Sequence, residues 1–279
     1  MSRPAPRFVE IAREVYLLRY PVLDVNVTLV VGDGEALLVD TLSTDAQARE
    51  LAAAARTVTA YPWSVVNTHH HFDHCFGNSV LAAGGRPVWG HPEAVALLVE
   101  RPEQLRRQWC GQWATADPEL AAGLAAVRIQ PPDRTVVRTA TLRLGGRPVQ
   151  LRHLGRGHTA GDLVVQVPDA DLLLAGDLVE ESGPPSFEDA YPLEWPETVA
   201  GLLHLAGPAT TVVPGHGRPV DREFVASQQR DLAALAWLIR DGDADRAPVA
   251  AVAAKAPFGP EPAAVAVRRG YAELAGRTG

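Results

Sequence analysis

The chain has 279 residues, of which 47% are hydrophobic, and this is enough for one large globular domain with a buried core. Its formal net charge is −7 and no block of Lys and Arg offsets it, so we expect no nucleic-acid partner. No apolar run is long enough to cross a bilayer, and the N-terminus lacks the apolar core of a secretory signal. We therefore expect a cytoplasmic protein with no membrane partner. The two cysteines, Cys75 and Cys110, are too few for a disulfide framework and are expected to be reduced.

Short runs rich in Val, Leu and Thr, bounded by Gly, Pro, Asp or Asn, predict strands along much of the chain. In the first half these strands are expected at residues 15–20, 26–31, 36–40, 64–68 and 87–90. Helical periodicity predicts two helices between and after them, at residues 44–58, with Thr44 or Asp45 as the N-cap, and at residues 91–109.

The second half repeats this order of strands followed by helices. Strands are expected at residues 135–138, 141–144, 149–154, 163–167, 172–177 and 211–215, and helices at 195–206 and 221–241. Two units of this kind predict an α+β fold in which sheet packs against sheet and helices cover the outside. This is a four-layer αββα sandwich.

Two segments have a different composition. Residues 180–194 are rich in Pro, Ser and acidic residues and predict an exposed loop. Residues 241–279 are rich in Ala and Pro, with a possible helix at 262–276, and we expect this extension to pack on the domain formed by residues 1–240. Apolar patches on the helix at 221–239 and on this extension either pair two chains as a homodimer or pack within one chain.

Four of the nine histidines lie in the stretch VVNTHHHFDHCFGN, residues 65–78. Imidazole ligands of a transition metal must converge to about 2.0–2.1 Å from the ion. Residues two apart in an extended segment point the same way, so His69 and His71 are expected to face one ion. Asp73 and His74 follow at the turn into a helix and are expected to face a second ion.

Histidine-rich runs also occur as solvated loops. Here the apolar run WSVVN precedes the histidines and predicts a buried strand, which places them at the edge of a sheet, where sites are commonly built. Gly77 follows and would allow the turn to approach its neighbours closely.

Three downstream residues complete a metal-binding pattern. His158, Asp177 and His216 each lie beside a predicted strand with glycine nearby. Each alone has an ordinary structural interpretation as a turn or strand-end residue. Together with the first cluster, in this order, they favour a metal site.

The H-x-H-x-D-H motif with downstream His, Asp and His resembles that of metallo-β-lactamase-fold hydrolases, and the resemblance spans residues 26–217. It implies the αββα sandwich, with residues 1–240 as the catalytic domain. It also implies two metal ions, one held by His69, His71 and His158, the other by Asp73, His74 and His216, with Asp177 bridging both.

The resemblance implies two zinc ions per chain, with iron or manganese possible. Water bound to such a metal has a pKa of about 7 instead of about 16, so hydroxide is available at neutral pH. We therefore expect a zinc-dependent hydrolase in which a metal-bridging hydroxide attacks a small-molecule substrate, namely an ester, thioester, lactone or lactam. Asp73 and Asp177 are the expected catalytic residues, Asp73 also relaying a proton to the leaving group.

Other functions stay open. Persulfide dioxygenases with this fold hold one iron with two His and one Asp, here roughly His69, His71 or His158 with Asp177. The superfamily's β-lactamases place a cysteine at the second metal or lack the bridging aspartate, so Asp177 disfavours that activity. A phosphodiesterase is also less favoured, and a zinc-stabilised scaffold without activity is the least favoured.

The other histidines, His70, His91, His153 and His204, are not expected to be ligands. His70 should point away from the metal side, His91 either caps the next helix or lines a pocket, and Asp40 closes a strand where it could orient an imidazole.

Aromatic residues near the site belong either to the core or to a substrate pocket; these are Trp109, Trp113, Phe187, Tyr191 and Trp195. Acidic residues of the loop at 180–194 are expected to discourage a strongly anionic substrate; these are Glu180, Glu181, Glu188, Asp189 and Glu194.

Overall fold

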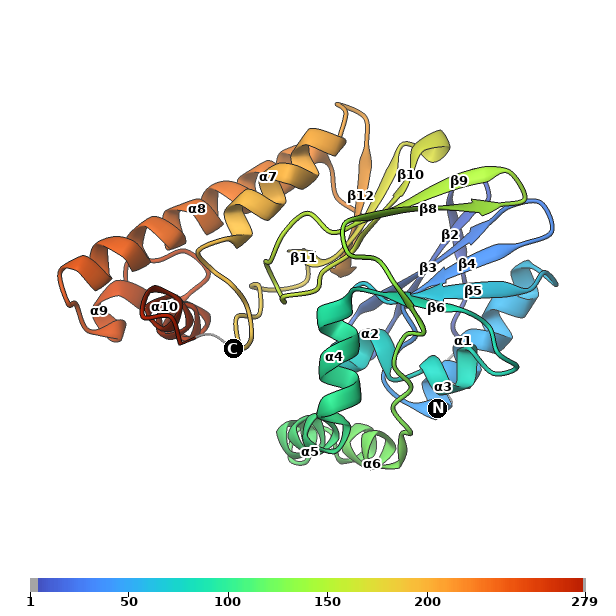
Figure 1. Ribbon diagram of the computed structural model, residues 1–279, viewed down its shortest axis with the longest axis horizontal. Helices are drawn as coiled ribbons and strands as arrows, with labels where there is room; N and C mark the ends of the chain where they lie inside the picture. Colours follow the sequence, from blue (N-terminus) through green and yellow to red (C-terminus); the bar gives the residue numbers. More distant parts are fainter. Residues whose placement is uncertain (1–4, 278–279) are drawn as a thin grey trace.

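Two half-sheets that meet along one edge form the centre of the fold (Figure 1). The computed structural model of the chain describes residues 5–277. The N-terminal half-sheet contains β1 (Val9–Ala12), β2 (Val15–Tyr20), β3 (Val25–Val31), β4 (Ala36–Val39), β5 (Trp63–Val66), β6 (Val88–Gly90) and β7 (Arg134–Thr135). The C-terminal half-sheet contains β8 (Thr139–Leu144), β9 (Arg147–Arg152), β10 (Val164–Val167), β11 (Leu172–Glu180) and β12 (Thr211–His216). The strand order is β7-β6-β5-β4-β3-β12-β11-β10-β9-β8, with β2 and β1 paired beside β3. The half-sheets join where His216 of β12 pairs with Val25 of β3.

Helices cover the outer face of each half-sheet. Those of the N-terminal half are α1 (Asp45–Val58), α2 (Phe72–Cys75), α3 (Asn78–Leu81), α4 (Pro92–Glu100), α5 (Pro102–Trp113) and α6 (Pro118–Ala126). Those of the C-terminal half are α7 (Trp195–Leu205), α8 (Arg222–Ala244), α9 (Val249–Ala253) and α10 (Pro260–Leu274), and a 3-10 turn, η1 (Pro168–Ala170), joins β10 to β11.

Alternating side chains of the central strands feed two different cores. In β4, Leu37 joins the core between the half-sheets, whereas Leu38 packs under α1. In β11, Leu174 joins the core between the half-sheets, whereas Leu173 packs under α7 and α8. Strands buried on both faces read as continuous apolar runs, which explains their composition. The fold is therefore the predicted α+β four-layer αββα sandwich.

The predicted helix at residues 91–109 is wrong as a single element. Pro102 lacks a backbone N–H and disfavours helical geometry at the residue before it, so α4 ends at Glu100 and Arg101 adopts φ −129° and ψ 33°. The chain then continues as α5. Pattern reasoning also missed α6, whose N-cap Asp117 accepts a hydrogen bond from the Leu120 backbone N–H at 2.9 Å.

Other boundaries also differ. The strand expected at residues 135–138 shares only Thr135 with the two-residue strand β7, which pairs with β6. The loop expected at 180–194 starts later, because β11 continues to Glu180, and it is only partly exposed. Phe187 and Ala190 of this segment are buried in the core beneath α7 and α8.

The C-terminal helices pack on α8. Val252 of α9 and Val267 of α10 belong to the same buried cluster as Leu232 and Ile239 of α8. The division of the chain after residue 240 stays a prediction, and that position lies inside α8. Dimerisation also stays a prediction; Trp237 on α8 is 62% exposed. Within residues 5–277, no helix combines the length and apolar character that crossing a membrane requires.

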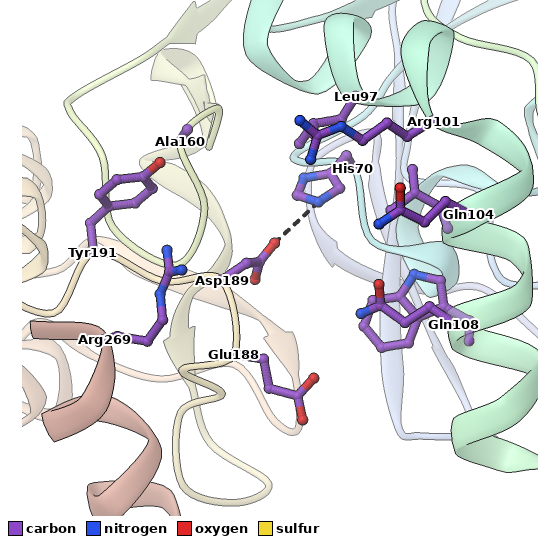
Figure 2. A pocket seen from close by; sticks show the side chains of 12 residues that line it. His70, Leu97, Arg101, Gln104, Gln108, Ala160, Glu188, Asp189, Tyr191 and Arg269 are labelled. Atoms are coloured by element: carbon purple, nitrogen blue, oxygen red, sulfur yellow. Dashed lines mark ion pairs between the residues drawn. The ribbon is translucent and has the colours of Figure 1, made fainter. Parts of the chain in front are cut away.

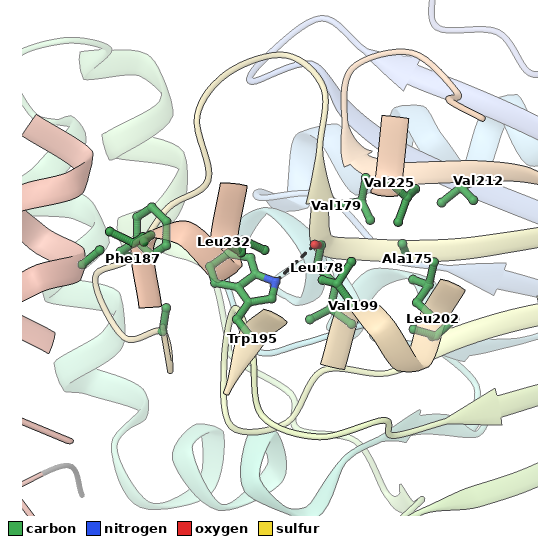
Figure 3. Packing of buried hydrophobic residues seen from close by; sticks show 14 of the residues in the cluster. Ala175, Leu178, Val179, Phe187, Trp195, Val199, Leu202, Val212, Val225 and Leu232 are labelled. Carbon is green, nitrogen blue, oxygen red and sulfur yellow. Dashed lines mark hydrogen bonds between the residues drawn. The ribbon is translucent and has the colours of Figure 1, made fainter. Parts of the chain in front are cut away.

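Trp195 is the largest side chain of the C-terminal core (Figure 3). Its indole is fully buried, donates a hydrogen bond from Nε1 to the Leu178 carbonyl at 3.2 Å, and packs against Phe187 with ring centroids 5.3 Å apart. Its ring also contacts His158 at 5.6 Å between centroids, so this core supports the histidine from behind.

We expect Trp195→Ala to lower the free energy of unfolding by about 3–5 kcal/mol, because it leaves a cavity in the C-terminal core. Trp237→Ala is the matched control and should change it by less than about 0.5 kcal/mol, since that indole is exposed. Urea unfolding of both variants measures the difference. Equal losses would contradict the packing described.

Candidate metal centre

The histidine motif lies in the turn between β5 and α2. The sequence predicted that His69 and His71 lie at the extended end of a strand. In the structure β5 ends at Val66, and both histidines lie in the turn that follows it. Asp73 and His74 belong to the single turn of α2. Gly77 makes the predicted close approach, since a Cβ there would lie 2.0 Å from the Thr41 carbonyl oxygen.

The other candidate residues come from the C-terminal half. His158 lies in the loop between β9 and β10, and His216 is the last residue of β12. Asp177 lies inside β11 and not at its end, beside an irregularity in the pairing with β12. Gly176 there has φ +53°, and a Cβ on Gly215 would lie 1.8 Å from Asp177 Oδ1. Glycine at these positions therefore gives the carboxylate room.

Asp177 lies at the centre of four imidazoles. Its Oδ2 is 3.6 Å from His69 Nε2, 3.4 Å from His158 Nε2 and 3.4 Å from His216 Nε2. Its Oδ1 is 3.2 Å from His74 Nε2. Because the imidazoles come from both halves of the fold, the site exists only where the half-sheets meet.

The ligand atoms divide into two groups, and both groups lie next to the carboxylate of Asp177. In the first, His69, His71, His158 and Asp177 each offer one atom within 4.8 Å of the others, and His158 Nε2 is 3.0 Å from His71 Nδ1. In the second, Asp73 Oδ2 lies 3.3 Å from His216 Nε2 and 3.6 Å from His74 Nε2. The structure therefore brings together all seven predicted metal-site residues.

Hydrogen bonds on the far side of the ring orient His69 and His71 of the first group, whereas Nδ1 of His158 is buried and has no hydrogen-bond partner within residues 5–277. Thr68 Oγ1 gives its proton to Asp40 Oδ2 at 2.8 Å, so it accepts from Nδ1 of His69 at 3.1 Å. This leaves the lone pair of His69 on Nε2, toward the centre. Nε2 of His71 lies 3.1 Å from both carboxylate oxygens of Asp189, so the neutral ring keeps its proton on Nε2 and has its lone pair on Nδ1.

The same arrangement orients the second group. Nδ1 of His74 donates to Asp40 Oδ2 at 2.8 Å, and Nδ1 of His216 donates to the Leu23 carbonyl at 2.7 Å. Both rings therefore present Nε2 to the centre. Asp40 has the orienting role that was one of its two interpretations from sequence.

The residues fit a divalent metal. Nε2 of His69 and Oδ1 of Asp177 are buried and have no hydrogen-bond partner within residues 5–277, which is costly unless another group binds them. Imidazole and carboxylate ligands suit zinc, and also iron or manganese. Cys75 is not a member of the set, because its Sγ donates to the His70 carbonyl at 3.1 Å.

Burial and the carboxylates act in opposite directions on these groups. Burial lowers the pKa of His69 well below its usual value and that of His158 to about 4. For His71 burial is outweighed by Asp189 and nearby acids, which raise its pKa to about 9. Asp177 and its neighbours likewise raise the pKa of His216 to about 10 and that of His74 well above its usual value.

The remaining histidines lie outside the two groups. His70 points away from them, as expected, and its Nε2 pairs with Asp189 at 3.1 Å. His91 is the N-cap of α4, where its Nδ1 accepts from the Glu93 backbone N–H at 3.3 Å, and its ring stacks on His153. His204 bonds within α7 to the Ala200 carbonyl.

Sequence reasoning missed two acidic residues at the site. Asp189 contacts both His70 and His71, and these three form a further potential ligand group, as do Glu180, Asp177 and His216. Both had been treated only as charges of a loop. The acidic composition of that loop was the available signal, but nothing in it indicates a partner more than a hundred residues earlier.

A pocket of about 220 Å³ opens onto the site. His71, Asp73, His158, Asp177 and His216 lie on its floor. Its walls are formed by Leu23, Phe72, Trp109, Trp113 and the segment at 182–186. Of the five aromatic candidates, Trp109 and Trp113 thus line this pocket, whereas Phe187 and Trp195 are core residues. Tyr191 lines a neighbouring pocket.

Comparison with known proteins agrees with this geometry. A family model described as the metallo-beta-lactamase superfamily matches residues 20–216. The type 2 metallo-beta-lactamase of Bacteroides fragilis is 25% identical over 196 residues, covering 69% of this chain and 68% of that protein. The type 2 metallo-beta-lactamase of Bacillus cereus is 34% identical over 84 residues, covering 29% of this chain and only 33% of that protein.

Solved structures share the fold. A metallo-beta-lactamase from Pontibacter korlensis superposes with a TM-score of 0.66 at 23% identity, covering 82% of this chain and 99% of that chain. The DIM-1 metallo-beta-lactamase superposes with a TM-score of 0.65 at 21% identity, covering 82% of this chain and 97% of that chain.

We expect Asp40→Asn to weaken metal binding about 10- to 100-fold at the site of His74, because the ring loses the carboxylate that orients it. Titration with Zn²⁺ against a chromophoric chelator measures the affinity. Asp33→Asn, on the exposed surface, is the control. Equal affinities in both variants would contradict the orienting role of Asp40.

Metal binding should release protons and tighten as pH rises. His71 and His216, with pKa values raised to about 9 and about 10, are protonated at pH 7 in the metal-free protein, whereas a ligand must be neutral. Affinity should therefore increase by about tenfold per pH unit for each proton displaced. Zn²⁺ calorimetry in buffers of different ionisation enthalpy counts these protons, and an affinity that stays flat from pH 6 to pH 8 would be inconsistent with the raised pKa values.

Proposed function

Since the family match covers residues 20–216, the chain belongs to the metallo-β-lactamase superfamily, and from this premise we propose that it is a zinc-dependent hydrolase with two metal ions. The proposed substrate is a small ester, thioester, lactone or lactam. One observation carries the proposal: two groups of buried ligand atoms converge on the single carboxylate of Asp177.

Each residue has a proposed role. One ion would be held by His69, His71 and His158 and the other by Asp73, His74 and His216, with Asp177 shared between them. Divalent ions bound there would supply Lewis acidity, polarising a carbonyl oxygen and lowering the pKa of a coordinated water to about 7.

Asp73 is placed to move a proton. Its carboxylate lies on the floor of the 220 Å³ pocket, 3.3 Å from His216 Nε2. From there it would pass a proton to the leaving group of a substrate in that pocket. The indoles of Trp109 and Trp113 and the side chain of Leu23 would exclude water around the reacting carbonyl.

The pocket size supports a small substrate. Its volume of about 220 Å³ is below the range of about 300–1,000 Å³ common for drug-sized ligands. The relatives named above are metallo-beta-lactamases, so a β-lactam belongs in the panel of carbonyl substrates to test. The ligand set described here has Asp177 and no cysteine, and it therefore favours esters, thioesters and lactones over lactams.

The second ligand group weighs against the alternative of a mono-iron dioxygenase. Such an enzyme needs two His and one Asp, and would give Asp73, His74 and His216 no role as ligands. Their ligand atoms nevertheless lie within 4.8 Å of one another. This convergence favours the hydrolase.

We expect Asp177→Ala to abolish hydrolysis of a panel of esters, thioesters, lactones and lactams, because the variant loses the carboxylate shared by both ligand groups. The metal content per chain should also fall, while circular dichroism stays unchanged. Asp231→Ala, on the exposed face of α8, is the matched control and should retain full turnover.

Two results would overturn the proposal. One is an Asp177→Ala protein with undiminished hydrolysis. The other is a wild-type protein that consumes oxygen with a persulfide substrate and cleaves no member of the panel.

A further inference from the structure

The acidic loop beside the site is largely neutralised by its own partners. Glu181 pairs with Arg218 at 2.8 Å, and Glu194 pairs with Arg156. Asp189 pairs with both His70 and His71 at 3.1 Å. The sequence-based expectation that this loop discourages a strongly anionic substrate stays a prediction, and three of its five acidic side chains are paired.

A second pocket, of about 340 Å³, lies beside the metal centre (Figure 2). Its walls come from opposite sides of the molecule, with α4 and α5 on one side and α10 and the segment at 188–191 on the other. The ion pair between His70 and Asp189 joins the two walls. Trp109 lines both this pocket and the smaller one over the ligands, and the adjacent residues His70 and His71 face one pocket each.

Two guanidinium groups point into this second pocket and form no ion pair with residues 5–277, although Glu273, whose pKa is raised by burial, lies close enough for the charge of Arg269 to oppose that rise. Arg101, at the junction of α4 and α5, makes no side-chain hydrogen bond or ion pair with any residue in 5–277. Arg269 of α10 donates from Nε to the Ala190 carbonyl at 3.1 Å. Its terminal nitrogens form no ion pair with the described part of the chain. Figure 2 shows the two groups directed into the pocket from opposite walls.

We propose that this second pocket is a carboxylate-binding subsite, in which Arg101 and Arg269 hold an anionic group of the substrate while its scissile carbonyl lies over the metal centre. The inference rests on the proposed hydrolase function. It specifies the substrate as an acyl compound with a carboxylate remote from the bond that is cleaved.

A carboxylate fits the pocket better than a more highly charged group. The planar guanidinium donates two parallel hydrogen bonds to a carboxylate, and an arginine without a partner is available for this. Glu188 also lines the pocket and has no ion-pair partner within residues 5–277, so it would repel a dianion more strongly than a monoanion. Gln104 and Gln108 of α5 add neutral amide donors on the wall that carries Arg101.

The test compares two substrates that differ only in charge. These are the N-acetylcysteamine thioesters of adipic acid, which ends in a carboxylate, and of adipamic acid, which ends in a neutral amide. Release of the thiol gives kcat/KM for the metal-loaded wild-type protein and for Arg101→Gln, Arg269→Gln and Arg230→Gln. Arg230 is exposed on α8, where it pairs with Glu223, and serves as the control.

We expect the wild-type protein to favour the adipic thioester. Arg101→Gln should lower kcat/KM for that substrate by about tenfold to a hundredfold, the effect of losing a charge-assisted hydrogen bond, and leave the adipamic thioester unchanged. Arg269→Gln should act in the same direction. Arg230→Gln should affect neither substrate.

Binding of adipate itself separates the two proposals. Calorimetry of the metal-loaded protein should show adipate binding that Arg101→Gln weakens. If neither thioester nor any other member of the carbonyl-substrate panel is cleaved but this dependence holds, the subsite stands and the hydrolase proposal fails. If both thioesters are cleaved equally well by wild type and Arg101→Gln, the subsite is overturned and the hydrolase stands. Tighter Arg101-dependent binding of inorganic phosphate than of adipate would overturn the assignment to a carboxylate.

Discussion

The placement of one buried carboxylate among four imidazoles is the constraint on which the rest of the structure depends. Asp177 is 5% exposed, and its oxygens lie 3.2–3.6 Å from His69, His74, His158 and His216. Removing an ionised group from water costs several kcal/mol unless nearby charges compensate it, so the carboxylate and the imidazoles stabilise one another. Two of these imidazoles come from each half of the fold, so the site spans the junction where β12 pairs with β3. A bound divalent cation would strengthen the same arrangement.

Several backbone features serve this placement directly. Gly77, Gly176 and Gly215 stand where a Cβ would meet the Thr41 carbonyl, the Thr68 side chain and the Asp177 carboxylate, respectively. Asp40 adopts φ +68°, a conformation that Asp tolerates better than most residues, and from there its carboxylate reaches both His74 and Thr68. Close backbone approaches and the positive φ angles of Asp40 and Gly176 therefore occur at the candidate metal centre. This is expected where the positions of functional side chains outweigh local backbone preference.

The sequence was sufficient to predict the four-layer sandwich and to select the seven residues that the structure brings together, because strand periodicity and the histidine motif are local signals. Local patterns failed where distant contacts decide the outcome. The loop after β11 was expected to be exposed and acidic, but Phe187 is buried under the helices and Asp189 pairs with histidines more than a hundred residues earlier. The split between α4 and α5 at Pro102 was visible in the sequence and was missed. The second pocket has no sequence signature, because its walls come from α4 and α5 in the N-terminal half and from α10 near the end of the chain.

The most direct test of the central claim is anomalous diffraction from a crystal of the metal-loaded protein, recorded at the absorption edge of the bound metal. The account predicts two anomalous peaks. One should lie among His69, His71 and His158 and the other among Asp73, His74 and His216, each within about 2.0–2.2 Å of its ligand atoms, with Asp177 in contact with both. A single peak confined to the first group, with the second group free of metal, would contradict a dinuclear hydrolytic centre.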